Sequence, residues 1–215
     1  LIEINSETDF VAKNKDFINF CKETSEINFI VKGNLENLLK SKMKNNITVE
    51  ENIVTLISKI GEKITIRRTN FFDKQDGKNF FYVHTAIEKN IGKIISVVKI
   101  EGLSDEKNIN LGNKLAMHIT ASSPLAIENS GIDKTIIEKE NEIIKAELIN
   151  SGKKGDMIEK ISKGKLNKFV SDNTLLSQAW IMDPKKKVLD VLKENKADKE
   201  IKIKQFLRYK VGEGV

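Results

Sequence analysis

Few residue types in this chain suit catalysis or metal binding. Its 215 residues include two His and one Cys, which leaves little from which to build a metal site, since most zinc sites draw their ligands largely from His and Cys. The sequence has no glycine-rich phosphate loop ending in Lys-Ser or Lys-Thr, no His-Glu-x-x-His and no Gly-x-Ser-x-Gly. We therefore expect no catalytic residue, no metal and no cofactor, in a protein that is not an enzyme.

The residues at positions 8 to 10 suit binding instead. A short apolar run at 1–4 is followed by Asn-Ser, which is typical of a strand entering a turn. Thr8, Asp9 and Phe10 come next, ahead of an amphipathic helix. An acid beside a large ring on an exposed corner suits insertion into another molecule. The local alternative is that Thr8 or Asp9 caps the helix and that Phe10 is a hydrophobic staple.

The elements that position this corner follow from hydrophobic spacing. The stripe from Phe17 to Val31 predicts a helix, and Phe10 would lie near it only if one helix ran unbroken through Asn14. Further helices are predicted over 35–43 and 48–60, with Gly61 as the stop of the latter, and a strand over 63–68. Asp76-Gly77, between two aromatic runs, predicts a hairpin turn.

The second half of the chain repeats strand and helix patterns. Strands are predicted over 91–100, with a bulge or close approach at Gly92, and over 203–211; helices are predicted over 111–121 and around 188–192. Helical patterns over 133–150 and 157–169, joined by a turn with two glycines, predict a helical hairpin. The segment 64–68 resembles 205–209, which suggests two related α+β subdomains.

Composition narrows the class of protein. At 24.3 kDa, with 39% hydrophobic and 32% charged residues, the chain can bury roughly 70% of its unfolded surface. It has no apolar run near the ~20 residues that span a bilayer and no signal peptide. It opens on Leu1, so we expect an N-terminal truncation. Cys21 is expected in the core, in a reducing compartment.

The formal net charge is +6, from 37 Lys and Arg against 31 Asp and Glu. This excess could assist binding to an acidic surface or to RNA, or it could reflect codon bias. The run Lys185-Lys186-Lys187 is interpreted as a solvated helix start, with RNA contact as the alternative. A basic interaction protein that associates with RNA or with the ribosome is therefore one expectation for this chain.

Separate stretches of the chain resemble the elongation factor Ts family, in that family's order. They are Thr-Asp-Phe-Val-Ala-Lys at 8–13; Lys-Ile-Gly-Glu at 59–62 running into Ile-Arg-Arg at 66–68; Tyr-Val-His at 82–84; Leu-Ala-Met-His at 115–118 with Ala-Ser-Ser-Pro at 121–124; Met-Asp-Pro at 182–184; and Val-Gly-Glu-Gly-Val at 211–215. Together they cover nearly the whole chain.

The resemblance implies an α+β fold of two related subdomains, each with a small antiparallel sheet flanked by helices, plus an inserted antiparallel helical hairpin, a coiled coil. We place the N-terminal subdomain at 1–78, the C-terminal subdomain at 79–140 and 181–215, and the hairpin at 141–180. Family members normally begin with a ubiquitin-associated-like module that helps to bind the partner. Nothing precedes Leu1 here, so we expect the core region without that module.

The resemblance also implies a guanine-nucleotide exchange factor for the translational GTPase elongation factor Tu, bound in its GDP-loaded and nucleotide-free states. The Phe10 ring would wedge between two helices of the GTPase and disturb its Mg²⁺ and phosphate site, so that GDP leaves and GTP can bind. Mg²⁺ is held by few protein ligands, and a coupling of ~3 kcal/mol changes nucleotide affinity roughly 150-fold. The residues that match the family's contact positions are Thr8, Asp9, Phe10, Val11, Ile60, Gly61 and His84.

Further expectations concern the location of the protein, its other partners and its two histidines. We expect no DNA or membrane partner and a cytoplasmic location, meaning the bacterial cytosol, or an organelle matrix or stroma if the source is eukaryotic. Self-association through the helical hairpin, oligomeric state and hairpin contact with the GTPase stay open. His84 could instead be a strand histidine packed near aromatic residues, and His118 is expected in the core because it shares a helix face with Leu111 and Leu115.

Overall fold

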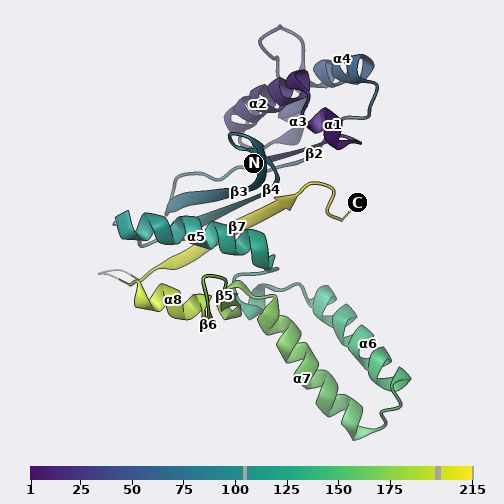
Figure 1. Cartoon of the computed structure of the whole chain (residues 1–215), viewed down its shortest axis with the longest axis vertical. Helices are drawn as coiled ribbons and strands as arrows, with labels where there is room; N and C mark the ends of the chain where they lie inside the picture. The colour runs from purple at the N-terminus through teal and green to yellow at the C-terminus, as the bar shows by residue number, and fades with distance from the viewer. Residues whose placement is uncertain (104–105, 197–199, 215) are drawn as a thin grey trace. The chain divides into compact units, whose positions relative to one another are not determined.

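The computed structural model describes residues 1–103, 106–196 and 200–214. The chain folds into helices and small antiparallel sheets, which confirms the predicted α+β class (Figure 1). The residues group into two compact units: the first contains 1–75, 83–95 and 209–214, and the second contains the described residues of 76–82 and 96–208. Each unit has a hydrophobic cluster of its own and is described by itself.

The first unit is built on a two-stranded antiparallel sheet of β1 (Ile2–Asn5) and β2 (Thr65–Thr69). The register sets Glu3 opposite Arg68 and Ile4 opposite Ile66, with a bulge between Glu3 and Ile4. β2 is the strand predicted from the alternation over 63–68. Because β1 runs directly into positions 8 to 10, this sheet fixes where the candidate corner begins.

A buried carboxylate ties the two ends of the chain together in the first unit. Glu3 is 3% exposed and accepts hydrogen bonds from the Arg67 guanidinium at 3.2 Å, from the Arg68 guanidinium and from the backbone N–H of Gly212 at 3.3 Å. The Arg68 guanidinium also lies 4.1 Å from the centre of the Tyr209 ring. These contacts join β1 and β2 to the last residues of the chain.

The helices of the first unit are α1 (Asp9–Ala12), α2 (Lys15–Ile30), α3 (Leu35–Lys40) and α4 (Val49–Ile60). A capping box starts α4: the Glu51 backbone N–H donates to Thr48 Oγ1 and the Thr48 N–H donates to the Glu51 carboxylate. Gly61 ends α4 with a φ of 82°, as its position predicts. Buried side chains of these helices and of Ile64 form the core of this unit.

A three-stranded sheet has the order β3–β4–β7, from β3 (Lys78–Glu88), β4 (Ile91–Glu101) and β7 (Lys202–Lys210). β3 and β4 form a hairpin through Lys89 and Asn90, and Asn90 has a φ of 63°, which favours a two-residue turn. The hairpin predicted at Asp76-Gly77 is wrong, because residues 71–77 form no strand. Phe71 packs instead on the ring of Phe29 in α2, with 5.5 Å between ring centres.

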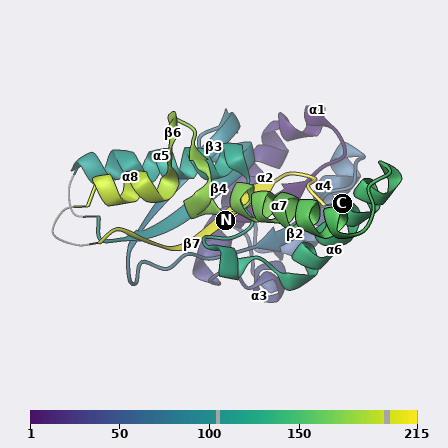
Figure 2. The same ribbon diagram turned by 90° about the horizontal axis from the view of Figure 1, so that it is seen from below.

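The second unit holds α5 (Glu106–Ser122), the 3₁₀ turns η1 (Asn129–Gly131) and η2 (Leu175–Ser177), β5 (Ala179–Trp180), β6 (Asp183–Lys187) and α8 (Val188–Glu194). Leu115 and Ile119 of α5 and Val188 of α8 are buried in one cluster, and both helices lie on the same side of the strands (Figure 2). Lys185-Lys186-Lys187 ends β6, which pairs with β5, and Lys187 is also the N-cap of α8, so a helix starts directly after the run, as predicted.

Two further helices of the second unit are α6 (Lys134–Asn150) and α7 (Asp156–Asp172), as the sequence predicts. Figure 1 shows them side by side. Ion pairs cross between them, from Lys145 to Glu159 at 2.8 Å and from Lys165 to Glu147 at 3.2 Å. Within the described ranges, none of the helices combines the length and apolar character that a membrane span needs.

His118 of α5 is a core residue, as predicted from its helix face. Its side chain is 0% exposed, its Nε2 lies 3.0 Å from Gln178 Oε1, and its ring stacks on Trp180 with 5.2 Å between centres. Burial lowers the pKa of His118, and the hydrogen bond with Gln178 offsets some of that shift. The folded protein therefore favours the neutral imidazole.

This burial predicts a loss of stability in mild acid. Below about pH 6.5, the ordinary pKa of histidine, the unfolded chain takes up a proton that folded His118 resists, so the free energy of unfolding falls with falling pH by up to ~1.4 kcal/mol per pH unit. Denaturant unfolding followed by the fluorescence of Trp180, the single Trp of the chain, should show this slope between pH 7.5 and 5.5. It should flatten in His118→Gln and persist in His84→Gln; an unchanged slope in His118→Gln would contradict the assignment.

The Glu3 network predicts a large effect of one side chain. Glu3→Ala leaves two guanidinium groups without their buried partner and should lower the free energy of unfolding by about 3 kcal/mol. Because Trp180 lies in the second unit, urea unfolding is followed here by far-ultraviolet circular dichroism. Glu7→Ala, at an exposed acid near the end of β1, is the matched control and should stay within about 0.5 kcal/mol of the parent protein. Equal losses in the two variants would rule out a special role for Glu3.

Candidate functional site

The candidate corner folds as a single helical turn, α1, that is separate from the helix after it. Asn14 starts α2, since its side-chain oxygen accepts hydrogen bonds from the backbone N–H groups of Asp16 at 2.8 Å and Phe17 at 3.3 Å. The chain therefore breaks between α1 and α2. Phe10 does not share the apolar stripe that begins at Phe17.

Two neighbouring side chains of α1 lie in different environments, one in solvent and one in the core. The Phe10 side chain is 86% exposed, whereas the Val11 side chain is 5% exposed and belongs to the core of the first unit. A ring so exposed does not act as a hydrophobic staple, so that alternative is wrong. Val11 anchors the turn from below, and its buried side chain is not accessible to a partner.

Thr8 precedes α1 in an extended conformation, in the N-cap position, but its side chain accepts no capping bond. Its backbone N–H donates to Glu62 Oε2 at 3.0 Å, and its Oγ1 donates to Glu62 Oε1 at 2.7 Å. A carboxylate 54 residues away thus accepts from both donors at the start of the turn. Sequence reasoning missed Glu62, because nothing in the local pattern joins it to Thr8.

Asp9 is paired with a lysine from another element of the first unit. Lys93 of β4 donates from Nζ to both oxygens of the Asp9 carboxylate, at 2.8 and 2.7 Å. The hydrogen bond with Lys93 and the positive charge of that residue hold the pKa of Asp9 below its usual value, and Lys13 adds to the effect. Sequence reasoning also missed Lys93, whose partner lies 84 residues away.

The other predicted residues of the first unit lie at the end of α4 and on β3. Ile60 is half-buried against the core cluster, and Gly61 is exposed and directly precedes Glu62. A Cβ built on Gly61 meets nothing within 4 Å. His84 is exposed on β3, and its carbonyl oxygen would lie 2.8 Å from a Cβ on Gly92, which is the close approach predicted for that glycine.

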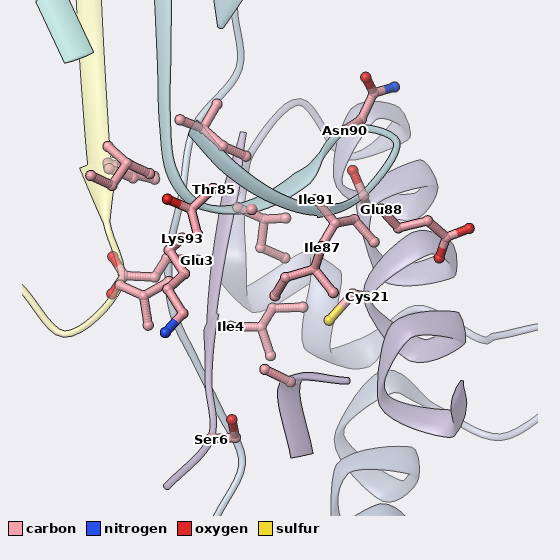
Figure 3. Close-up of a pocket in the computed structure, with 18 of the residues that line it drawn as sticks. Glu3, Ile4, Ser6, Cys21, Thr85, Ile87, Glu88, Asn90, Ile91 and Lys93 are labelled. Carbon is pink, nitrogen blue, oxygen red and sulfur yellow. The ribbon is translucent and has the colours of Figure 1, made fainter. Parts of the chain in front are cut away.

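A groove of about 840 Å³ brings some of these residues together within the first unit. Thr8, Asp9 and His84 all line it, with Lys93. Its apolar walls come from several elements: Figure 3 shows Ile4 of β1, Cys21 of α2 and Ile87 of β3 gathered around one space. The groove does not include Phe10, Val11, Ile60 or Gly61 in its lining.

Chemically, this site is suited to contact rather than to reaction. Burial raises the pKa of the Cys21 thiol to about 12, so the thiol is protonated and is a weak nucleophile. Among the residues that the structure describes, no three His, Cys, Asp or Glu side chains gather where they could hold a metal ion. What the arrangement offers is an exposed aromatic ring on a turn that is held at both sides.

Comparisons with known proteins find one and the same family over nearly the whole chain. A family model described as Elongation factor TS matches residues 7–213. Elongation factor Ts of Rickettsia felis is 35% identical over 219 residues, which covers 100% of this chain and 71% of that protein. Elongation factor Ts of Methylorubrum populi is 37% identical and that of Rickettsia prowazekii is 36% identical, with the same coverage. The similarity includes α1 and the residues around it.

The ion pair at α1 predicts a measurable pKa change. Replacing the lysine in Lys93→Met removes the hydrogen bond and charge that favour the ionised carboxylate, so the pKa of Asp9 should rise toward that of a free aspartate, about 3.9. A carbon-13 NMR titration of the Asp9 carboxyl measures it. Lys89→Met, in the turn of the same hairpin, is the control and should leave the titration unchanged. An Asp9 pKa that does not move in Lys93→Met would mean that the pair does not form in solution.

Proposed function

The chain belongs to the elongation factor Ts family, and from this premise we propose that it is a guanine-nucleotide exchange factor for elongation factor Tu that acts by inserting Phe10 into the GTPase. Members of this family are translation elongation factors rather than enzymes in the usual sense. The proposal concerns the mechanism, the bound states of the GTPase and the residues involved.

The observation that carries the proposal is the exposure of Phe10. An aromatic ring that is 86% exposed in the free protein leaves much apolar surface in water, and its burial in a partner gives the energy typical of an interface hot spot. Its place inside the stretch 8–13, which resembles the family signature, supports the same assignment. Insertion next to a Mg²⁺ site weakens nucleotide binding by linkage, without any bond made or broken.

The other proposed contact residues lie in different places in the first unit, so we propose different roles for them. Thr8, Asp9 and His84 line one groove, and Ile60 and Gly61 lie at the end of the helix that precedes Glu62. We propose that these residues supply further contacts with the GTPase beside the ring. Val11 supports Phe10 from inside the core.

We also propose that α6 and α7 act as a coiled-coil module inserted in the second subdomain. We propose further that the protein works in the cytoplasm, with no DNA or membrane partner.

The test is release of fluorescent GDP from elongation factor Tu, followed by stopped flow as the concentration of this chain rises. The parent protein should accelerate release. Phe10→Ala should reduce the second-order rate constant by about 30-fold, which corresponds to a hot spot of ~2 kcal/mol. Circular dichroism should show an unchanged fold.

Phe29→Ala is the matched control, since Phe29 is also an exposed phenylalanine of the first unit, at 63% exposure. It should retain full acceleration. No acceleration by the parent protein would refute the exchange function, and full activity of Phe10→Ala would refute the wedge alone. A gel shift with RNA at physiological ionic strength completes the experiment, because a stable complex there would favour the RNA-binding alternative.

A further inference from the structure

We propose that Glu62 and Lys93 are positioning residues for nucleotide exchange: they hold α1 from two sides so that the Phe10 ring meets the GTPase in one orientation. This inference rests on the exchange function proposed above. Neither residue is expected to touch the nucleotide, and both act through the turn that carries the ring.

The need for such support follows from the length of α1. The helix has four residues, and the cap residue before it contributes no side-chain cap. Forming one helical turn fixes several dihedral angles for a single hydrogen bond, so an isolated turn is unstable in water. The conformation of α1 must therefore come from contacts with the rest of the first unit.

Glu62 supplies the contact at the start of the turn. Its two carboxylate oxygens accept from the Thr8 N–H at 3.0 Å and from Thr8 Oγ1 at 2.7 Å. Both bonds go to Thr8, the N-cap residue of α1, so this carboxylate fixes the residue at which the turn begins. Gly61, with a φ of 82°, ends α4 immediately before Glu62, which turns the chain so that the carboxylate can reach Thr8.

Lys93 supplies the contact on the other side. Its ammonium group lies 2.8 and 2.7 Å from the Asp9 oxygens and comes from the β3–β4 hairpin rather than from α4. In the free protein the Asp9 carboxylate is thus already engaged inside the chain. The role of Asp9 is then to fix the turn, in addition to any contact with the partner.

With Val11 buried in the core, the residues on both sides of Phe10 in the sequence are held by the rest of the first unit. A side chain presented in its bound position loses less conformational freedom when the complex forms, so it binds better for the same contact area. Exposed ion pairs and hydrogen bonds are individually weak, so each positioning residue should change exchange modestly and should do so only while Phe10 is present.

The first test is made on the free protein. In Glu62→Ala and in Lys93→Met, the NMR order parameter of the Phe10 amide should fall from the value of rigid backbone, about 0.85, toward about 0.6. Glu50→Ala in α4 and Lys89→Met in the hairpin are the matched controls and should leave it unchanged. A Phe10 amide that stays rigid in both test variants would overturn the proposal, whatever happens to exchange.

The second test measures GDP release by elongation factor Tu in a double-mutant cycle. Glu62→Ala should lower the second-order rate constant by about fivefold and Lys93→Met by about threefold. In the Phe10→Ala background neither change should have a further effect, because both residues act through the ring. Thr8→Val removes the hydroxyl donor and keeps the backbone N–H, so it should give part of the effect of Glu62→Ala, whereas Thr8→Ser, which keeps both donors, should retain the parent rate.

The outcomes separate this proposal from the exchange function. Equal losses with and without Phe10 would show that Glu62 and Lys93 serve only general stability, which overturns the positioning role. Full exchange in both variants despite a mobile Phe10 amide would overturn it as well, while leaving the exchange function intact. A Phe10→Ala variant with full activity would instead refute the wedge, and the positioning role with it.

Discussion

The pair of hydrogen bonds from Thr8 to the Glu62 carboxylate is the interaction on which the candidate site depends. It joins residues 54 positions apart at the start of a turn too short to be stable alone. Lys93 completes the support by pairing with Asp9 from the β3–β4 hairpin. A flexible loop carrying the same ring would lose more freedom on binding. In the proposed mechanism, the polar contacts of Thr8 and Asp9 therefore matter as much as the exposed ring itself.

Glu3 has a comparable role deeper inside the first unit. Its buried carboxylate binds both arginines of β2 and a backbone N–H near the end of the chain. Because β1 leads into α1, the contacts that hold β1 in place also determine where α1 begins. Removing a charge from water is unfavourable unless it is paired and hydrogen-bonded, so a shift of β1 against β2 that took Glu3 away from these partners would be costly.

Among the described residues, the thiol and the acid of this site are both held in unreactive states. Its thiol is protonated because it is buried, and its acid is paired with a lysine. An exposed aromatic ring next to a groove with apolar walls is instead typical of an interface anchor. In the exchange mechanism proposed above, such an anchor would act through differential binding, without a covalent step.

The sequence by itself determined the α+β class and most element positions, because hydrophobic spacing and capping residues act over a few positions, and its resemblance to the family supplied the candidate residues around Phe10. It misplaced the hairpin at Asp76-Gly77, since a turn signal does not reveal whether its flanks find a pairing partner. Only the tertiary structure decided that Phe10 is exposed while Val11 is buried, and that Glu62 and Lys93 hold the turn. Those contacts join residues 54 and 84 positions apart, and pairing over such distances is set by how the whole chain packs.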